Sequence, residues 1–267
     1  MTLWLLTGSR GEVGSALRRR LLHRGLQVVE LELERPRPEA ARLVHLAGRL
    51  PTAPVHEQIQ SNVSFLQEVV CHCECHGVPE IVFASTNSIY AGHPGPSIDE
   101  EKVLIDPEVY ALTKYLGERL LEHSRIERVL CLRLPGILEL RRSTSFMSRL
   151  FDRLRSGEPV TLFNADHPFN HFLSIDALHD FLCALRLSRH FDVVNLAAPA
   201  ERTLFEVAST LKSLLGSSSP IVRRDGGPPP TRMDTTRAER VYGYSPPGVD
   251  ATLRAWVGER LCAMAGV

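Results

Sequence analysis

Short runs of apolar residues alternate with stretches of helical periodicity over the first half of the chain. The runs, which are rich in Leu, Val and Ile, occupy residues 3–6, 26–31, 43–47, 80–84 and 128–133. Continuous apolar runs of this length are typical of strands buried on both faces of a parallel sheet. Between them, apolar residues recur at the spacing of one helix face in the ranges 13–25, 62–76 and 106–122. This alternation predicts an α/β fold in which helices cover both sides of a doubly wound parallel sheet.

The pattern is less regular in the C-terminal part of the chain. Helical periodicity returns in 146–156, 176–187 and 204–215, and short strand-like runs lie at 160–163 and 193–196. The segment from Gly216 to Pro230 is rich in Ser, Gly and Pro, which predicts a mobile loop. The sequence contains no internal repeat and no linker long enough to separate independent domains.

Composition and charge narrow the classes of protein to which the chain can belong. Of its 267 residues, 43% are hydrophobic and 23% are charged, which is ordinary for a globular protein. The 31 basic and 31 acidic side chains cancel, so nothing predicts a nucleic acid or a membrane surface as partner. No apolar run approaches the roughly 20 residues of a membrane span, and the first residues lack the basic start of a signal peptide. We therefore expect a cytoplasmic protein.

Three of the six cysteines cluster with two histidines in the segment Cys71–His76. Thiols and imidazoles at this density are typical of metal sites, which is one interpretation of the segment. The alternative is the end of a helix, because the apolar spacing of residues 62–76 continues through the segment to Gly77. Helical spacing spreads these side chains around the axis, so we expect no metal. Nor do six cysteines in a chain of this length indicate a disulfide framework.

A glycine-rich segment, Thr7-Gly8-Ser9-Arg10-Gly11-Glu12-Val13-Gly14, joins the first predicted strand to the first predicted helix. Glycines allow a tight turn and a close approach of the backbone to a pyrophosphate, which the amides and dipole of the helix N-terminus attract. The complete strand–loop–helix–strand context distinguishes this segment from an isolated glycine motif. The sequence therefore predicts a dinucleotide-binding loop. The alternative is a structural turn in a protein without coenzyme.

An acidic residue about 20 positions further on is expected to bind the hydroxyls of the adenosine ribose. Glu30, Glu32 and Glu34 are candidates, and Glu32 best fits the end of the second strand. Arg10 and Arg35 flank the same place and would suit the 2′-phosphate of the other coenzyme. The cofactor is therefore predicted to be NAD or NADP, with the choice left open.

Tyr110 and Lys114 stand four residues apart on one predicted helix, so their side chains share a face. A cation beside a phenol favours the phenolate and lowers its pKa, which makes Tyr110 usable as a general acid or base. Upstream, hydroxyl residues gather in the segment 84–92, where a predicted strand ends. Ligands of open α/β sheets bind at the carboxyl ends of the strands, which favours a functional pair over a chance pair on the surface.

Together these motifs resemble the extended short-chain dehydrogenase/reductases, the NAD-dependent epimerase/dehydratase family. The resemblance covers most of the chain and rests on the following segments: Thr7 to Gly14, His45-Leu46-Ala47-Gly48, Asn62, Ser85-Thr86 before Ile89-Tyr90, Tyr110 with Lys114, Leu132-Arg133-Leu134-Pro135, Asn170 to Asp176, and Asp234 to Ala238. It implies a Rossmann-type fold with a small C-terminal substrate-binding lobe, a nicotinamide coenzyme and, as a rule, a nucleotide-sugar substrate. Within one unit spanning 1–267, the implied dinucleotide-binding core covers approximately 1–136 and 171–198, and the substrate lobe approximately 137–170 and 199–267.

The resemblance also implies roles for individual residues. Tyr110 would move the hydroxyl proton while a hydride passes to or from the nicotinamide, and Lys114 would hold the nicotinamide ribose and tune Tyr110. Thr86 fits the catalytic hydroxyl that bonds the substrate oxygen, with Ser85 as the fallback. Coenzyme contacts are implied for Gly8, Ser9, Arg10, Gly11, Glu12, Val13, Glu32, Leu46, Ala47, Gly48, Asn62, Ala84, Tyr110, Lys114, Pro135 and Gly136. Substrate contacts are implied for Thr86, Asn87, Asn170 and Arg232.

On the coenzyme side, the sequence departs from the family pattern after the second strand. Only nine residues separate Leu33 from Leu43, where the family usually places a helix, a third strand and an acidic adenine contact. We therefore expect this unit to be missing and the adenine side of the coenzyme site to be shortened.

On the substrate side, Thr86 is followed by Asn87 and Ser88 rather than by the acidic pair of sugar 4,6-dehydratases, which disfavours dehydration. Arg232 is a candidate phosphate contact, as are Arg141 and Arg142, with solvated surface arginines as the alternative.

The sequence thus predicts an NAD(P)-dependent epimerase or reductase that acts on a sugar, by resemblance a nucleotide-linked one. One alternative is a coenzyme-binding protein with degenerate or no catalysis, which the shortened adenine side motivates. Another is a reductase of a small carbonyl compound that is not nucleotide-linked. Family members often dimerise through two helices, so the resemblance implies a homodimer that packs residues 62–76 and 110–122 in a four-helix interface.

Overall fold

The computed structural model describes residues 3–37, 39–93, 95–102, 104–138, 145–226 and 231–265. The chain divides into two compact units. The first consists of Met1–His93, Glu100–Leu134 and His179–Asn195, and the second of Pro94–Asp99, Pro135–Leu178 and Leu196–Val267. The boundary between them falls inside helix α6 (Ile175–Ala184). The assignment of coenzyme and substrate to separate lobes stays a prediction.

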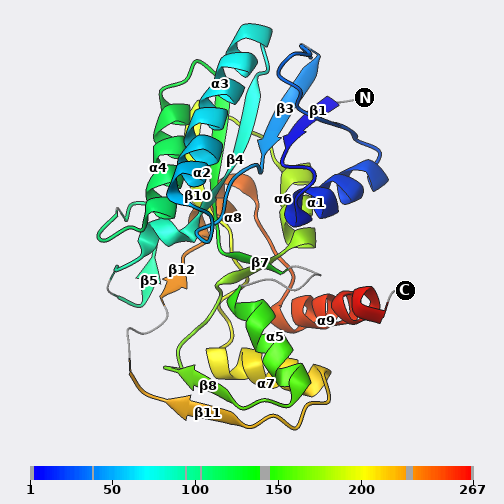
Figure 1. The fold of residues 1–267 in the computed structure, drawn as a ribbon, viewed down its shortest axis with the longest axis vertical. Helices are drawn as coiled ribbons and strands as arrows, with labels where there is room; N and C mark the ends of the chain where they lie inside the picture. Colours follow the sequence, from blue (N-terminus) through cyan, green and yellow to red (C-terminus); the bar gives the residue numbers. More distant parts are fainter. Residues whose placement is uncertain are drawn as a thin grey trace. The chain divides into compact units, whose positions relative to one another are not determined.

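Six parallel strands form the sheet of the first unit (Figure 1). In chain order they are β1 (Leu3–Thr7), β2 (Gln27–Glu30), β3 (Ala40–His45), β4 (Glu80–Thr86), β6 (Arg128–Leu134) and β10 (Phe191–Asn195). Their order across the sheet is β10-β6-β4-β3-β1-β2, and every neighbouring pair is parallel. The chain therefore begins next to one edge and returns across the sheet after β2. This topology confirms the predicted doubly wound α/β fold.

Helices cover both faces of this sheet. On one face, α3 (Phe65–His76) and α4 (Val109–Glu122) lie side by side, and α2 (Val55–Ile59) with the π-helical turn η1 (Gln60–Ser64) leads into α3 (Figure 1). On the other face, α1 (Glu12–His23) packs against β1 and β2 and is followed, as predicted, by a left-handed glycine, Gly25. Leu43, Leu66 and Phe83 are fully buried between the strands and the first pair of helices.

Two helix boundaries differ from the prediction. The helix expected to begin at Asn62 begins at Val55 and passes through a π-helical turn, whose wider spacing a search for α-helical periodicity does not detect. The helix that carries Tyr110 has Glu108 as its N-cap, so Asp106 lies outside it. No side chain caps this helix among the described residues, and its start is therefore set by packing rather than by local capping.

The predicted absence of a helix and a third strand after β2 is confirmed for the described residues. The described residues between β2 and β3, 31–37 and 39, form neither a helix nor a strand, and β3 pairs directly with β1. β2 is consequently the edge strand of the sheet. The family usually has a further strand beyond this position.

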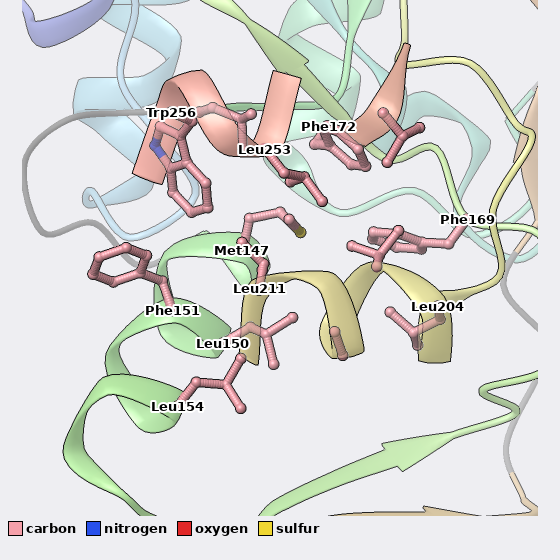
Figure 2. Close-up of a cluster of buried hydrophobic side chains, with 14 of the residues drawn as sticks. Met147, Leu150, Phe151, Leu154, Phe169, Phe172, Leu204, Leu211, Leu253 and Trp256 are labelled. Atoms are coloured by element: carbon pink, nitrogen blue, oxygen red, sulfur yellow. The ribbon is translucent and has the colours of Figure 1, made fainter. Parts of the chain in front are cut away.

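The second unit has its own hydrophobic core, which Figure 2 shows in close-up. The core is built mainly by α5 (Phe146–Ser156), α7 (Leu204–Leu214) and α9 (Val249–Ala265). Side chains such as Phe151, Phe172 and Leu211 are fully buried there. This unit has no broad sheet among the described residues; its strands pair two by two: β8 (Val160–Phe163) with β11 (Ile221–Arg224), β5 (Ser97–Ile98) with β12 (Arg232–Met233), and β7 (Gly136–Leu138) with β9 (Phe172–Ser174).

The prediction of a mobile loop over 216–230 is wrong in part. Residues Ile221–Arg224 form β11, which pairs in parallel with β8, and Ile221 packs against the core of the second unit. The strand is only four residues long, and the surrounding Ser, Gly and Pro residues obscure its pattern. Residues 227–230 lie outside the described part of the chain.

Candidate coenzyme and catalytic site

The glycine loop folds back on itself between β1 and α1. The Gly11 amide donates to the Gly8 carbonyl at 3.1 Å, and a Cβ on Gly14 would lie 2.0 Å from the Gly8 oxygen. Gly8 has a φ of +72°, and its Cβ would lie 2.7 Å from the Ala47 nitrogen. Only glycine fits at these two positions. Within the described residues no side chain caps α1 at Gly11, so the helix N-terminus suits a pyrophosphate.

The segment after β3 lies beside this loop. The Leu46 amide donates to the Thr7 carbonyl at 3.3 Å, and the Ala47 amide donates to Thr7 Oγ1 at 3.2 Å. Gly48 follows, and a Cβ there would lie 2.8 Å from Asn62 Oδ1 and 3.0 Å from Lys114 Nζ. The structure therefore brings the predicted coenzyme residues of this segment next to the glycine loop and next to Lys114.

Asn62 is buried in η1 and ties three elements together. Its Oδ1 accepts from the Arg49 amide at 2.7 Å, and its Nδ2 donates to the Arg49 carbonyl at 3.1 Å. Nδ2 also donates to Thr113 Oγ1 at 3.0 Å, and the Thr113 hydroxyl donates to the Tyr110 carbonyl at 2.8 Å. Asn62 thus links the segment after β3 to the first turn of α4, as a supporting residue would. π-helical turns occur frequently at functional sites.

Lys114 extends its ammonium group into the interior of the first unit. Nζ donates to the Ala84 carbonyl at 3.0 Å and lies 4.9 Å from the centre of the Phe83 ring. Lys114 is only 5% exposed, and burial lowers its pKa to about 8 because a desolvated ammonium is less stable than the neutral amine. The pKa of Lys114 is therefore close to physiological pH, and a small rise in pH removes the charge from part of the molecules.

The Tyr110 phenol, at the start of α4, lies close enough to the Thr86 side chain, at the end of β4, for that hydroxyl to affect the pKa of the phenol. Thr86 Oγ1 donates to Ser88 Oγ at 3.2 Å. Thr86 Oγ1 also accepts from the Ser88 amide at 3.1 Å, so it caps the short helix η2 (Asn87–Tyr90). Burial raises the pKa of Tyr110, and the Thr86 hydroxyl offsets only part of this effect. The prediction that Lys114 gives the phenol a lowered pKa is wrong, because desolvation is the larger effect and the ammonium donates to the Ala84 carbonyl.

Ser85, the fallback for the catalytic hydroxyl, points into a different network. Its Oγ donates to Glu118, and the Glu118 carboxylate accepts from Arg133 at 3.0 Å and 2.8 Å. All three side chains are buried. The contacts therefore favour Thr86 over Ser85 as the hydroxyl that works beside the phenol.

Sequence reasoning missed three supporting residues. Glu118 had a usable signal, since it stands four positions after Lys114 on the same helix face. Arg49 acts through its backbone, and Thr113 contacts Asn62 across 51 positions of the chain, so spacing could not reveal them.

Exposed charged side chains occupy the predicted adenine side of the coenzyme site. Glu32, the predicted ribose contact, lies beyond the end of β2, and its carboxylate pairs with Arg35 Nε at 3.0 Å. The Arg35 amide donates to the Glu32 carbonyl at 3.0 Å, which closes a turn. Arg10 is exposed in the glycine loop. Opposite charges thus meet beside the predicted ribose contact, and the choice between NAD and NADP stays open.

Two of the predicted substrate residues lie in the second unit. Asn170 is buried, and its amide group bonds the carbonyl and the amide of Met233 at 2.8 Å and 3.0 Å. This side chain therefore holds β12 in place. Arg232 is exposed on the same strand, with Nη2 3.5 Å from Ser97 Oγ. Contacts of these two residues with a substrate stay predictions.

The other predicted residues are spread over both units. Asn87 begins η2 in the first unit, directly after Thr86. In the second unit Gly136 begins β7 and Pro135 directly precedes it, and the contact of both residues with nicotinamide stays a prediction. Arg141 and Arg142 lie outside the described residues.

The cysteine cluster is the end of a helix, as predicted. α3 ends at His76 and is capped by left-handed Gly77. Cys73 is buried in the core, whereas Cys71 and Cys75 are exposed. Among the described residues, no three His, Cys, Asp or Glu side chains are grouped so that they could hold a metal ion. None of the helices in the described ranges is long and apolar enough to cross a membrane.

Comparison with known sequences places the chain among nicotinamide-dependent proteins. The model of the NAD dependent epimerase/dehydratase family matches residues 42–197. The uncharacterized UDP-glucose epimerase YtcB of Bacillus subtilis (strain 168) is 24% identical over 200 residues, which are 72% of this chain and 63% of that protein. The chain thus spans less than two thirds of the length of this relative.

Solved structures share the fold over nearly the whole chain. The Bordetella bronchiseptica enzyme WbmG in complex with NAD and UDP has a TM-score of 0.79 at 19% identity, covering 99% of this chain and 96% of its own. RMD from Pseudomonas aeruginosa, complexed with NADPH, has a TM-score of 0.77 at 19% identity, covering 97% and 99%. These likenesses establish the fold, and the family match extends over more than half of the sequence. The chain therefore belongs to the NAD dependent epimerase/dehydratase family.

Proposed function

We propose that this protein is an NAD(P)-dependent epimerase or reductase that acts by hydride transfer on a nucleotide-linked sugar. The observation that carries the proposal is the grouping of Thr86, Tyr110 and Lys114 where β4 ends, in the unit that holds the glycine loop. Open α/β sheets bind their ligands at the carboxyl ends of the strands. Family membership and the name of the relative YtcB support the nucleotide-sugar class.

A bound nicotinamide coenzyme would supply the hydride acceptor or donor. The backbone of residues 8–13 would bind its pyrophosphate at the N-terminus of α1. Residues 46–48, Asn62 and Ala84 would form the wall next to the nicotinamide ribose. Lys114 Nζ would donate to the ribose hydroxyls, and Glu32 would serve the adenosine ribose.

Tyr110 would exchange the proton of the reacting sugar hydroxyl. Because burial keeps the phenol protonated, it begins as the acid when a carbonyl is reduced, and it accepts the proton in the reverse direction. Thr86 would bond the same substrate oxygen and orient it toward the phenol. Asn87, Asn170 and Arg232 would contribute to the binding of the substrate.

Removal of the phenol oxygen of Tyr110 tests this mechanism. Tyr110→Phe removes the proton-transferring group and is expected to lower turnover by about 10²–10⁴-fold, the usual contribution of general acid–base catalysis. NMR detection of the epimer formed from UDP-glucose or UDP-glucuronic acid measures the rate. Tyr115→Phe is the matched control, since this neighbouring tyrosine is half-buried and has no role in the proposed mechanism. Full activity of Tyr110→Phe would contradict the mechanism.

The edge position of β2 favours a second candidate, a coenzyme-binding protein with little or no catalysis. Calorimetric titration with NADH and NADPH separates the candidates. Tight binding without turnover of any UDP- or dTDP-sugar would support the second one. A third candidate is a reductase of a small carbonyl compound, and a rise in melting temperature with UDP-sugars would count against it.

We further propose a cytoplasmic homodimer. An apolar stripe on α4, formed by Val109, Leu112 and Leu116, is exposed by 38%, 45% and 46%, and Val55 and Ile59 on α2 are exposed by 51% and 47%. Apolar groups at the spacing of one helix face are suited to packing against a second copy. All six cysteines are free thiols, which fits a reducing compartment.

A further inference from the structure

His45, the last residue of β3, is fully buried although it is polar. Its ring lies between those of Phe65 and Phe83, with centroid distances of 5.9 Å and 5.7 Å. Nδ1 lies 3.1 Å from Thr7 Oγ1, whereas Nε2 has no hydrogen-bond partner among the described residues. The mechanism proposed above uses none of these atoms. A buried histidine with one bonded and one unbonded nitrogen requires a reason.

The contacts of Thr7 guide the choice of tautomer for this ring. Thr7 Oγ1 accepts from the Ala47 amide at 3.2 Å, and in the described part of the chain the only acceptor recorded for its own hydrogen is His45 Nδ1. We assign the Thr7 hydroxyl as the donor to Nδ1, because this arrangement uses its hydrogen, and the ring proton is then on Nε2. Burial, and to a smaller extent the charge of Lys114, lowers the pKa of His45 to about 3, so the ring is neutral.

We propose that His45 is a positioning residue for the coenzyme loop: by accepting from Thr7, it orients the Thr7 hydroxyl toward the Ala47 amide and so holds the end of β1 against the segment after β3. This inference rests on the proposed function, because its consequence is coenzyme binding. The junction is close-packed, since a Cβ on Gly8 would lie 2.7 Å from the Ala47 nitrogen. A small shift of Ala47 therefore moves the glycine loop.

Two substitutions separate the hydrogen bond from the packing. His45→Asn keeps an acceptor at the δ position but loses the ring, whereas His45→Phe keeps the ring between its aromatic neighbours but loses the acceptor. We expect His45→Phe to weaken NADH binding roughly three- to tenfold, which corresponds to one hydrogen bond. His45→Asn is expected to bind NADH nearly as the wild type does, although its melting temperature is the lower of the two. Fluorescence titration with NADH and NADPH measures both affinities.

A purely structural role predicts the opposite order, with affinity following melting temperature. That result, or wild-type affinity in His45→Phe, would overturn the inference. Thr7→Val removes this hydrogen bond from its other end, together with the acceptor of the Ala47 amide, so the link through which His45 is proposed to act is already lost. The losses in Thr7→Val and His45→Phe should therefore not add in the double variant, and additive losses would also refute the positioning role.

The failure of the proposed function would look different. If the wild type binds neither NADH nor NADPH, the proposed function is wrong and the role of His45 is measured without coenzyme. Amide hydrogen exchange at Ala47 is then expected to be faster in His45→Phe than in His45→Asn, because only the former releases the Thr7 hydroxyl. Equal exchange rates in the two variants would overturn the inference independently.

Discussion

At the scale of single residues, the burial of Lys114 has an effect that can be measured through pH. Its pKa lies at about 8 in the folded chain, against 10.5 for an exposed lysine. Between these values the unfolded chain binds a proton that the folded chain does not, so the free energy of unfolding rises with pH. Below about pH 8 both states are protonated, and the cost of burying the cation is fully present.

We predict that the free energy of unfolding of the wild type rises relative to that of Lys114→Met by about 3 kcal/mol in total between pH 8 and pH 10.5. Coenzyme affinity should fall over the same range, because the Lys114 ammonium loses its proton and with it the positive charge. Urea titrations at a series of pH values measure the first effect, and NADH titrations the second. Parallel stability curves for the two proteins would show that Lys114 titrates normally.

The buried pair of Glu118 and Arg133 gives a second prediction. Glu118→Gln leaves the Arg133 guanidinium buried without its counter-charge, so unfolding should become easier by about 3–5 kcal/mol. Glu122→Gln, which breaks the exposed pair with Arg119 on the same helix, should change stability by less than about 1 kcal/mol. Urea denaturation measures both values. Equal effects would mean that the Glu118 network contributes no more than a surface ion pair.

What the sequence reveals at this scale depends on distance along the chain. Tyr110 and Lys114 are four positions apart, so their shared face could be predicted from spacing. The hydroxyl partner of the phenol could be narrowed only to Ser85 or Thr86, because their directions depend on where Glu118 lies. The sign of the Tyr110 pKa shift was not predictable, since burial is a property of the packed molecule.

At the scale of elements, the glycine loop and the end of α3 each contain a glycine with a left-handed backbone, and the two can be compared. Gly8 has a φ of +72° and is packed against backbone, whereas Gly77 has a φ of +70° and has nothing within 4 Å of an added Cβ. Gly77→Ala should therefore lower stability by about 1–2 kcal/mol through backbone strain alone. Gly8→Ala should lower it further and also abolish NADH binding, because Ala47 must move. Thermal unfolding and NADH titration test the pair, and retained binding in Gly8→Ala would be contrary to the prediction.

Elements could be predicted where burial on both faces makes an apolar run. β1, β3 and β4 are of this kind, and each was located within a few residues. Strands of two or three residues, such as β5 and β7, carry no periodicity and were not predicted. The π-helical turn η1 was not predicted for a related reason, since its residue spacing differs from that of the α-helix around it.

At the scale of the whole molecule, the apolar stripe on α4 carries the proposed dimer. Leu112→Glu with Leu116→Glu places two charges in the interface and should convert the dimer to a monomer, as measured by light scattering. Val222→Glu, at a comparably exposed apolar position in the second unit, is the control and should leave the mass unchanged. A wild-type protein that is already monomeric at micromolar concentration would contradict the dimer.

The architecture of the first unit followed from the alternation of strands and helices, including the gap after β2. The second unit was predicted less completely, because its core is assembled from α5, α7 and α9, which are separated by long stretches of sequence. Pairings such as β5 with β12, which joins residues more than a hundred positions apart, leave no local signal.

Because β2 is the edge strand of the sheet, a further strand from a related protein could be inserted next to it. A chain whose sheet ends one strand early can be extended within residues 33–37, which form no helix or strand, without disturbing any existing pair of strands. Inserting the helix–strand segment of a longer family member there would create a chimera that differs from its parent only beside the proposed adenine site. The ratio of their coenzyme affinities would then measure, in isolation, what a third strand contributes to a Rossmann-type site.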